Sequence, residues 1–109
     1  MGIFRTARSS ASSSTISMAV APAAPWELYE IRVHLDAGGA AGNLTAIADA
    51  GMGSKHDTTY WTKAMVGLTD ATQTFDPPIR FTHHNDQLDI TYANGSSAAY
   101  GVEVVYRLI

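Results

Sequence analysis

Residues 87–109 read QLDITYANGSSAAYGVEVVYRLI, and this stretch holds the two clearest alternating patterns in the chain. Hydrophobic residues occupy every second position, at Leu88, Ile90 and Tyr92 and again at Tyr100, Val102, Val104, Tyr106 and Leu108. Successive side chains of a strand point to opposite faces, so a period of two predicts two strands, each with one face for a core. The Asn94-Gly95 pair between them is typical of a tight turn, and the two strands are expected to form a hairpin.

Shorter segments of the same kind precede this stretch and are separated by turn residues. Strands are expected over residues 15–21, 26–36, 43–50, 58–66 and 79–82, with a loop into a short strand over 67–74, a break at 76–78 and a turn at 83–86. In the strand 26–36, Tyr29, Ile31, Val33 and Leu35 face inward, whereas Leu28 is out of phase and indicates a bulge or a second buried face. The sequence therefore predicts an all-β protein, a single jelly-roll-like β-sandwich of seven or eight antiparallel strands over residues 15–109.

The expected core of this sandwich follows from the shared alternation. Its members are Ile31, Val33, Leu35, Leu88, Ile90, Tyr92, Val102, Val104 and Tyr106. A chain of 109 residues has room for one domain, and its 46% hydrophobic content is that of a globular protein. The net charge of −3 argues against nucleic acid as a direct partner, and no apolar run reaches the roughly 18 residues of a membrane-spanning helix. The absence of cysteine excludes disulfides, thiol catalysis and thiolate metal sites.

Residues 1–14 are predicted to form a flexible N-terminal arm, because a serine-rich segment buries too little apolar surface to offset the cost of ordering it. Arg5 and Arg8 carry the only charges among the first 26 residues, which suggests that the arm becomes ordered on an acidic partner surface. A secretory signal and N-myristoylation at Gly2 are weaker interpretations. The serine run interrupts the apolar segment that a signal needs, and the myristoylation pattern is short.

The residue types that could support catalysis do not occur in productive patterns. His83 and His84 are adjacent and would point apart on a strand, and no third ligand lies at a familiar spacing, so neither a metal nor another cofactor is expected. No nucleophile–base pair is apparent, and Asp86 and Asp89 are expected to hold turn amides. The sequence thus predicts that the protein is not an enzyme.

Exposed aromatic and small residues suggest binding instead. Trp26, Tyr60 and Trp61 could stack on sugar rings or anchor a protein interface, and Ala46 and Ala48 suit the close approach of another sheet or subunit. The candidate partner interface comprises Arg5, Arg8, Trp26, Ala46, Ala48, Tyr60 and Trp61.

Five stretches together resemble a family of small proteins encoded in tailed-bacteriophage virion gene clusters. They are WELYEIRVHL (26–35), GNLT (42–45), PIRF (78–81), DITYAN (89–94) and YGVEVVYR (100–107). Some relatives in that group are capsid decoration, or cement, proteins with a jelly-roll fold. The resemblance covers about residues 15–109 and brings no catalytic residue with it.

The resemblance implies a non-enzymatic virion structural protein, made in the host cytoplasm and located on the outer surface of the capsid. Its expected partners are the major capsid protein and other copies of itself, in a homotrimer that the cement-protein resemblance implies. Direct contact with nucleic acid or membrane is not expected. A tail, neck or head-fibre module remains an alternative, and a carbohydrate-binding module is a third interpretation.

Overall fold

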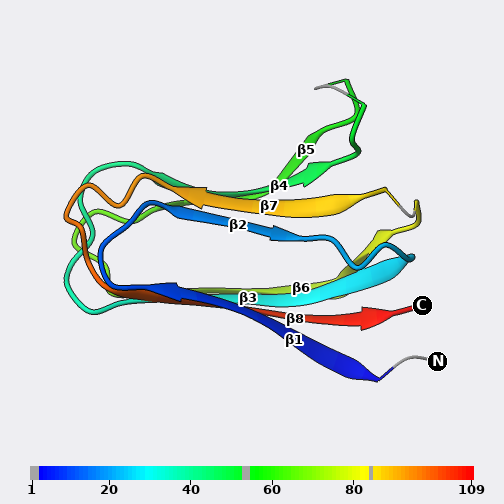
Figure 1. Ribbon diagram of the computed structural model, residues 1–109, viewed down its shortest axis with the longest axis horizontal. Coiled ribbons are helices and arrows are strands. Elements are labelled where there is room, and N and C mark those ends of the chain that lie inside the picture. Colours follow the sequence, from blue (N-terminus) through cyan, green and yellow to red (C-terminus); the bar gives the residue numbers. More distant parts are fainter. Residues whose placement is uncertain (1–2, 53–54, 84) are drawn as a thin grey trace.

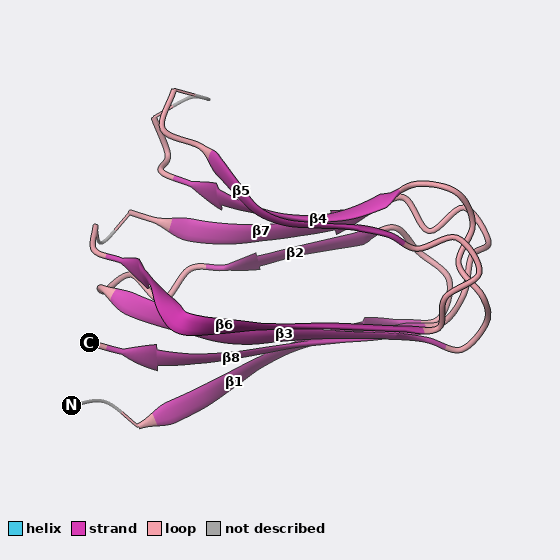
Figure 2. Ribbon diagram, turned by 180° about the vertical axis from the view of Figure 1, so that it is seen from behind, coloured by secondary structure: helices cyan, strands magenta, loops and turns pink. Residues whose placement is uncertain are grey.

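The computed structural model describes residues 3–52, 55–83 and 85–109, which fold into eight strands. These are β1 (Phe4–Ala11), β2 (Ile16–Val20), β3 (Trp26–Leu35), β4 (Asn43–Asp49), β5 (Thr58–Ala64), β6 (Asp70–Phe81), β7 (Gln87–Tyr92) and β8 (Tyr100–Leu108). Sheet A has the strand order β1-β8-β3-β6 and sheet B the order β2-β7-β4-β5, and the two sheets pack face to face (Figures 1 and 2). Within the described ranges there is no helix that could cross a membrane.

The strand pairing is that of a jelly roll. β1 pairs with β8, β2 with β7, β3 with β6 and β4 with β5, all antiparallel, so the chain is folded as one long hairpin of four strand pairs. The hairpin is rolled up so that β3 also pairs with β8 and β4 with β7, which creates the two sheets. The predicted all-β jelly-roll sandwich is therefore confirmed.

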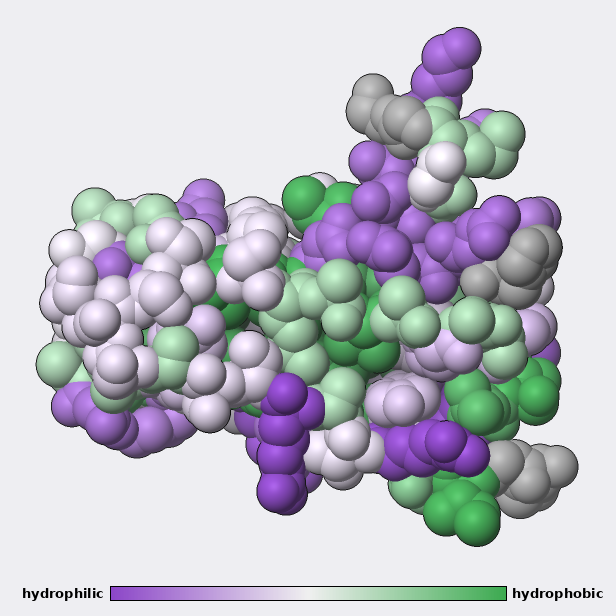
Figure 3. Space-filling view, viewed as in Figure 1, coloured by the Kyte–Doolittle hydropathy of each residue, from purple (hydrophilic) through white to green (hydrophobic). Residues whose placement is uncertain are grey.

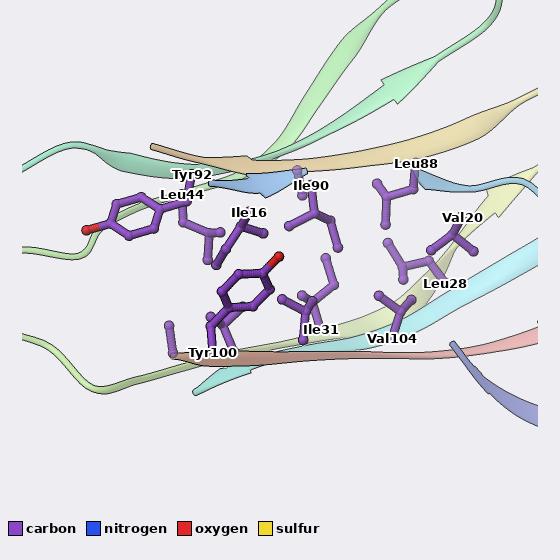
Figure 4. Packing of buried hydrophobic residues seen from close by; sticks show 14 of the residues in the cluster. Ile16, Val20, Leu28, Ile31, Leu44, Leu88, Ile90, Tyr92, Tyr100 and Val104 are labelled. Atoms are coloured by element: carbon purple, nitrogen blue, oxygen red, sulfur yellow. The ribbon is translucent and has the colours of Figure 1, made fainter. Parts of the chain in front are cut away.

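The predicted core lies between the sheets. Eight of its nine members are buried, and Tyr106 is half-buried against them. Figure 4 shows side chains of sheet B, such as Ile16 and Ile90, pointing toward Ile31 and Val104 of sheet A. The bulge expected near Leu28 is also present, because the pairing of β3 with both neighbours shifts between Leu28 and Glu30. The shift lets Leu28 and Ile31 both face the core although they are three positions apart.

The predicted hairpin of residues 87–109 is wrong, because its two strands belong to different sheets. β7 pairs with β2 and β4, whereas β8 pairs with β1 and β3. A turn is present, but the positive φ angles are at Asn94 (56°) and Ser97 (53°) and not at Gly95, so it is not the two-residue turn expected from the Asn-Gly pair. The buried Asn94 side chain donates to the carbonyls of Ser14 (2.8 Å) and Ala98 (2.9 Å) and accepts from the Ala98 amide (3.2 Å). These bonds stabilise a connection that crosses from one sheet to the other.

The break predicted at residues 76–78 does not divide the strand. β6 runs from Asp70 to Phe81, although its pairing with β3 moves from Thr74 to Ile79 across the bulge. Proline removes a ladder donor and is tolerated in strands at a sheet edge, and β6 is the edge of sheet A. Pro77 and Pro78 therefore interrupt the pairing without ending the strand.

The flexible arm predicted for residues 1–14 is wrong for Phe4–Ala11, which form β1 and pair with β8 along their whole length. Apolar burial is not what orders this segment. β8, flanked by β3 on one side, offers a row of backbone hydrogen-bonding groups on the other, and β1 pairs with them. Met1 and Gly2, including the myristoylation pattern, lie outside the described residues.

Candidate functional site

The outer face of sheet A carries a row of charged side chains across β1, β8 and β3. Arg8, Glu103 and Arg32 are direct cross-strand partners, so their side chains share this face. The Glu103 carboxylate accepts from Arg8 Nε at 2.7 Å through one oxygen and from Arg32 Nη1 at 2.8 Å through the other. Arg32 Nε also donates to Glu30. Both arginines are thus paired with carboxylates, and their side chains are largely exposed.

His34 extends this arrangement toward β6. Its Nδ1 lies 2.8 Å from Asp70 Oδ1 and its Nε2 lies 3.1 Å from Asp36 Oδ1. Both ring nitrogens face carboxylates, which favours the doubly protonated imidazolium. The hydrogen bond to Asp70 is the main cause that raises the pKa of His34 above its ordinary value, and the same contact lowers the pKa of Asp70.

A shallow depression of about 430 Å³ opens between these groups. Its floor is at Gly101 of β8, which pairs with Ser10 on one side and with His34 on the other. A Cβ atom placed on Gly101 would meet no other heavy atom within 4 Å, so the missing side chain leaves open space. Arg8, Arg32, Thr72, Asp70 and Glu103 complete the polar walls.

The opposite end of the same face holds an aromatic–arginine cluster, formed by Phe4, Tyr29, Arg107 and Glu27. The Phe4 and Tyr29 rings meet edge to face with centroids 4.7 Å apart, and the Arg107 guanidinium lies 5.6 Å and 5.5 Å from them. Arg107 also donates to the buried Glu27 carboxylate at 2.6 Å, which lowers the pKa of Glu27. Phe4 remains 56% exposed. The cluster therefore presents an aromatic ring and an oriented cation at the surface.

The structure separates the seven residues predicted for a partner interface. Trp26 and Ala46 are fully buried in the core, so their assignment to a surface is wrong: Trp26 stacks on Phe81, and Ala46 faces the other sheet. Ala48 and Trp61 are half-buried against the core, while Tyr60 is 41% exposed. The prediction that one of the two aromatic residues is exposed agrees with these positions. The prediction that they point to opposite faces is wrong, because the register of β5 shifts at Tyr60 and its ring meets the buried Phe81 ring of sheet A with centroids 6.2 Å apart.

The two arginines predicted as joint anchors also separate. Arg8 lies on the outer face of sheet A with Glu103. Arg5 is three residues away on the same strand, and an odd separation places it on the other side of β1. One flat partner surface therefore does not meet both side chains in the same way.

The inward position predicted for Tyr29 is wrong, because the register of β3 shifts between Leu28 and Glu30 and places Tyr29 on the outer face with Phe4 and Arg107. The sequence did not mark Phe4, Gly101 or Glu103 as members of a site. The alternation of β3 did identify Arg32 and His34 as outward-facing. Their partners Glu103 and Asp70 lie 71 and 36 positions away, and only the strand register brings them together. No local signal in the sequence marks such pairs.

The predicted turn at residues 83–86 is present, with the Asp86 amide donating to the His83 carbonyl (3.0 Å) and the His83 amide donating to Asp86 Oδ2 (3.2 Å). His84 lies outside the described residues. Among the side chains that the structure describes, no group of three or more His, Asp or Glu is arranged to hold a metal ion.

The contribution of His34 to stability is expected to depend on pH. Because the folded-state pKa is raised, the stabilisation is complete below the unfolded value of about 6.5 and is lost as the pH rises through the folded value. The pKa of Asp70 is lowered in the folded protein. Its contribution to stability is therefore present above about pH 4 and is lost as the pH falls through the folded-state pKa. The stability difference between the wild type and His34→Gln should thus be largest near about pH 5–6 and shrink toward about pH 9.

Urea unfolding of both proteins across this pH range measures that difference. The other histidines are present in both proteins, so their contributions to stability cancel. A difference that stays constant with pH would show that His34 is not held as an imidazolium between the two carboxylates.

The fold and this face define a jelly-roll β-sandwich with an organised set of charged and aromatic side chains on one sheet. Compared with known proteins, the chain matches no protein family, and no curated protein matches it.

Proposed function

We propose that the protein is a non-enzymatic structural component of a bacteriophage virion, a capsid decoration protein that binds the major capsid protein on the outer surface of the head. The sequence resemblance supports this role, and the jelly-roll fold agrees with what that resemblance implies. The docking surface is the aromatic–arginine cluster at the end of sheet A.

The observation that carries the proposal is the exposure of apolar side chains at this end of the molecule. Ile3 is 82% exposed, Phe4 56% and Ile109 57%. Figure 1 places the start of β1 close to the end of β8, and Figure 3 shows hydrophobic atoms at the same end of the molecule. Aromatic residues and arginine are enriched in the cores of protein interfaces, where they carry most of the binding energy.

The cluster is prepared for binding before a partner arrives. Glu27 and the two rings fix Arg107, so little rotamer entropy remains to be lost when a partner covers it. This differs from an arm that becomes ordered on the capsid, because β1 is already paired in the free protein. Self-association as a trimer, which the resemblance implies, is proposed to use other surfaces, including that around Tyr60 on β5.

Replacing Phe4 by Ala is expected to weaken attachment to undecorated heads by roughly tenfold or more, because truncating a hot-spot anchor costs about 2 kcal/mol or more and tenfold corresponds to about 1.4 kcal/mol. Val66→Ala is the control, since it truncates another exposed apolar side chain (63%) that belongs to neither proposed surface. Co-sedimentation of each variant with heads measures the affinity, and circular dichroism checks that both fold.

Full binding by folded Phe4→Ala would exclude the cluster as the docking surface. If the wild-type protein failed to bind heads but bound purified tails or fibres, the capsid role itself would be wrong and the tail or fibre alternative would replace it.

A further inference from the structure

We propose that the depression over Gly101 is a binding site for a neutral saccharide unit. The site lies at the end of sheet A opposite the aromatic–arginine cluster, and the proposal does not depend on the proposed function. It also differs from the sugar platform expected from the sequence, because Trp26 of that platform is buried in the core.

The floor of the depression favours a compact ligand that lies flat on the sheet. Any residue other than glycine would project a side chain from the sheet at position 101. Gly101 instead exposes its backbone, and a Cβ atom there would meet no heavy atom within 4 Å. β8 pairs there with β1 and β3 on its two sides, through Ser10 and His34. A peptide therefore cannot bind by adding a strand at this position, and recognition must come from the walls.

The walls favour a ligand without net charge. Arg8 and Arg32 are already paired with Glu103, and His34 is paired with Asp70. An anion would have to compete with these carboxylates for the cations, and a cation would meet the paired arginines. Neither kind of charged ligand gains much net attraction.

The same walls favour hydroxyl groups. Carboxylates accept hydrogen bonds, guanidinium groups donate them, and the hydroxyls of Ser10 and Thr72 do both. A sugar hydroxyl also donates and accepts, so neighbouring hydroxyls on a ring can bond to both kinds of group at once. Cross-strand ion pairs connect the walls, and each guanidinium and carboxylate keeps further donor or acceptor positions that an apolar ligand would strip of water without replacing.

Two-dimensional NMR of the isotope-labelled protein tests the proposal, with methyl α-D-glucopyranoside, methyl β-D-galactopyranoside and maltose as separate probes. At least one of them should shift the amides of Ser10, His34 and Gly101 in a saturable manner, with a Kd on the order of 1–10 mM. Gly101→Leu places a side chain in the depression, starting from a Cβ position that has no heavy atom within 4 Å, and should weaken this binding at least roughly tenfold. Its folding stability should be unchanged or slightly higher, because a strand gains from replacing glycine.

Thr74→Leu is the control, because it places the same leucine side chain on the outer face of the same sheet outside the depression. This variant should bind as the wild type does. Absence of saturable shifts with all three sugars overturns the proposal, and so do shifts that map elsewhere or survive Gly101→Leu. Inorganic phosphate is added in a separate titration. Tighter binding of phosphate at the same amides would identify an anion site and would also overturn the proposal.

Discussion

Val104→Asp is expected to abolish folding. Val104 is fully buried in the middle of β8, opposite Ala7 of β1 and Ile31 of β3. A carboxylate there has no partner and costs several kcal/mol, out of a total stability of roughly 5–15 kcal/mol for a domain of this size. Circular dichroism should show loss of the sheet signal, and urea unfolding should show no cooperative transition.

Val105→Asp is the control for this substitution, since the neighbouring side chain points to the outer face. Its cross-strand partners are Thr6 and Glu30, so the new carboxylate meets one like charge and costs under about 1 kcal/mol. This variant should fold. If Val104→Asp also folds with the wild-type melting temperature, the inward assignment of Val104 is wrong.

Trp26→Ala is expected to give the second largest effect, a loss of about 3–5 kcal/mol in the free energy of unfolding. The fully buried Trp26 ring stacks on Phe81 with centroids 4.3 Å apart and meets Tyr106 edge to face at 5.6 Å. Its removal leaves a cavity between the sheets. Thermal unfolding should register a fall in Tm of roughly 4–8 °C for each kcal/mol lost.

Tyr60→Ala serves as the comparison, because it removes a large aromatic side chain that is 41% exposed. Its cost should be clearly smaller. Near-wild-type stability of Trp26→Ala would instead restore the earlier interpretation of Trp26 as a surface residue available to a partner.

The strands themselves were predictable because alternation is a local property. In β3, β7 and β8 the hydrophobic side chains recur every second residue, and this period directly reflects which face meets the core. Even the bulge of β3 left a local signal, since Leu28 breaks the phase.

The partners of each strand were not predictable in the same way. The Asn94-Gly95 pair correctly indicated a turn, yet the turn observed has its positive φ angles at Asn94 and Ser97 and connects two sheets instead of closing a hairpin. β7 and β8 do not pair with each other because each has other neighbours. β2 and β4 flank β7, and β1 and β3 flank β8. β1 is the clearest case, because its sequence has little apolar character and it forms a strand only where β8 offers backbone partners.

The amino-acid order alone thus established the fold class, most strand positions, eight of the nine expected core residues as fully buried, and the outward charged row of β3. The tertiary structure decided which strands are neighbours, and with them the two surfaces proposed to bind. Glu103 joins Arg8 and Arg32, and Phe4 joins Tyr29 and Arg107, through registers between distant strands. The physical reason is that hydrophobic alternation is a pattern of neighbouring residues and can be read from the sequence. Strands pair through backbone N–H and C=O groups, which nearly every residue carries, so the sequence does not show which strands are neighbours.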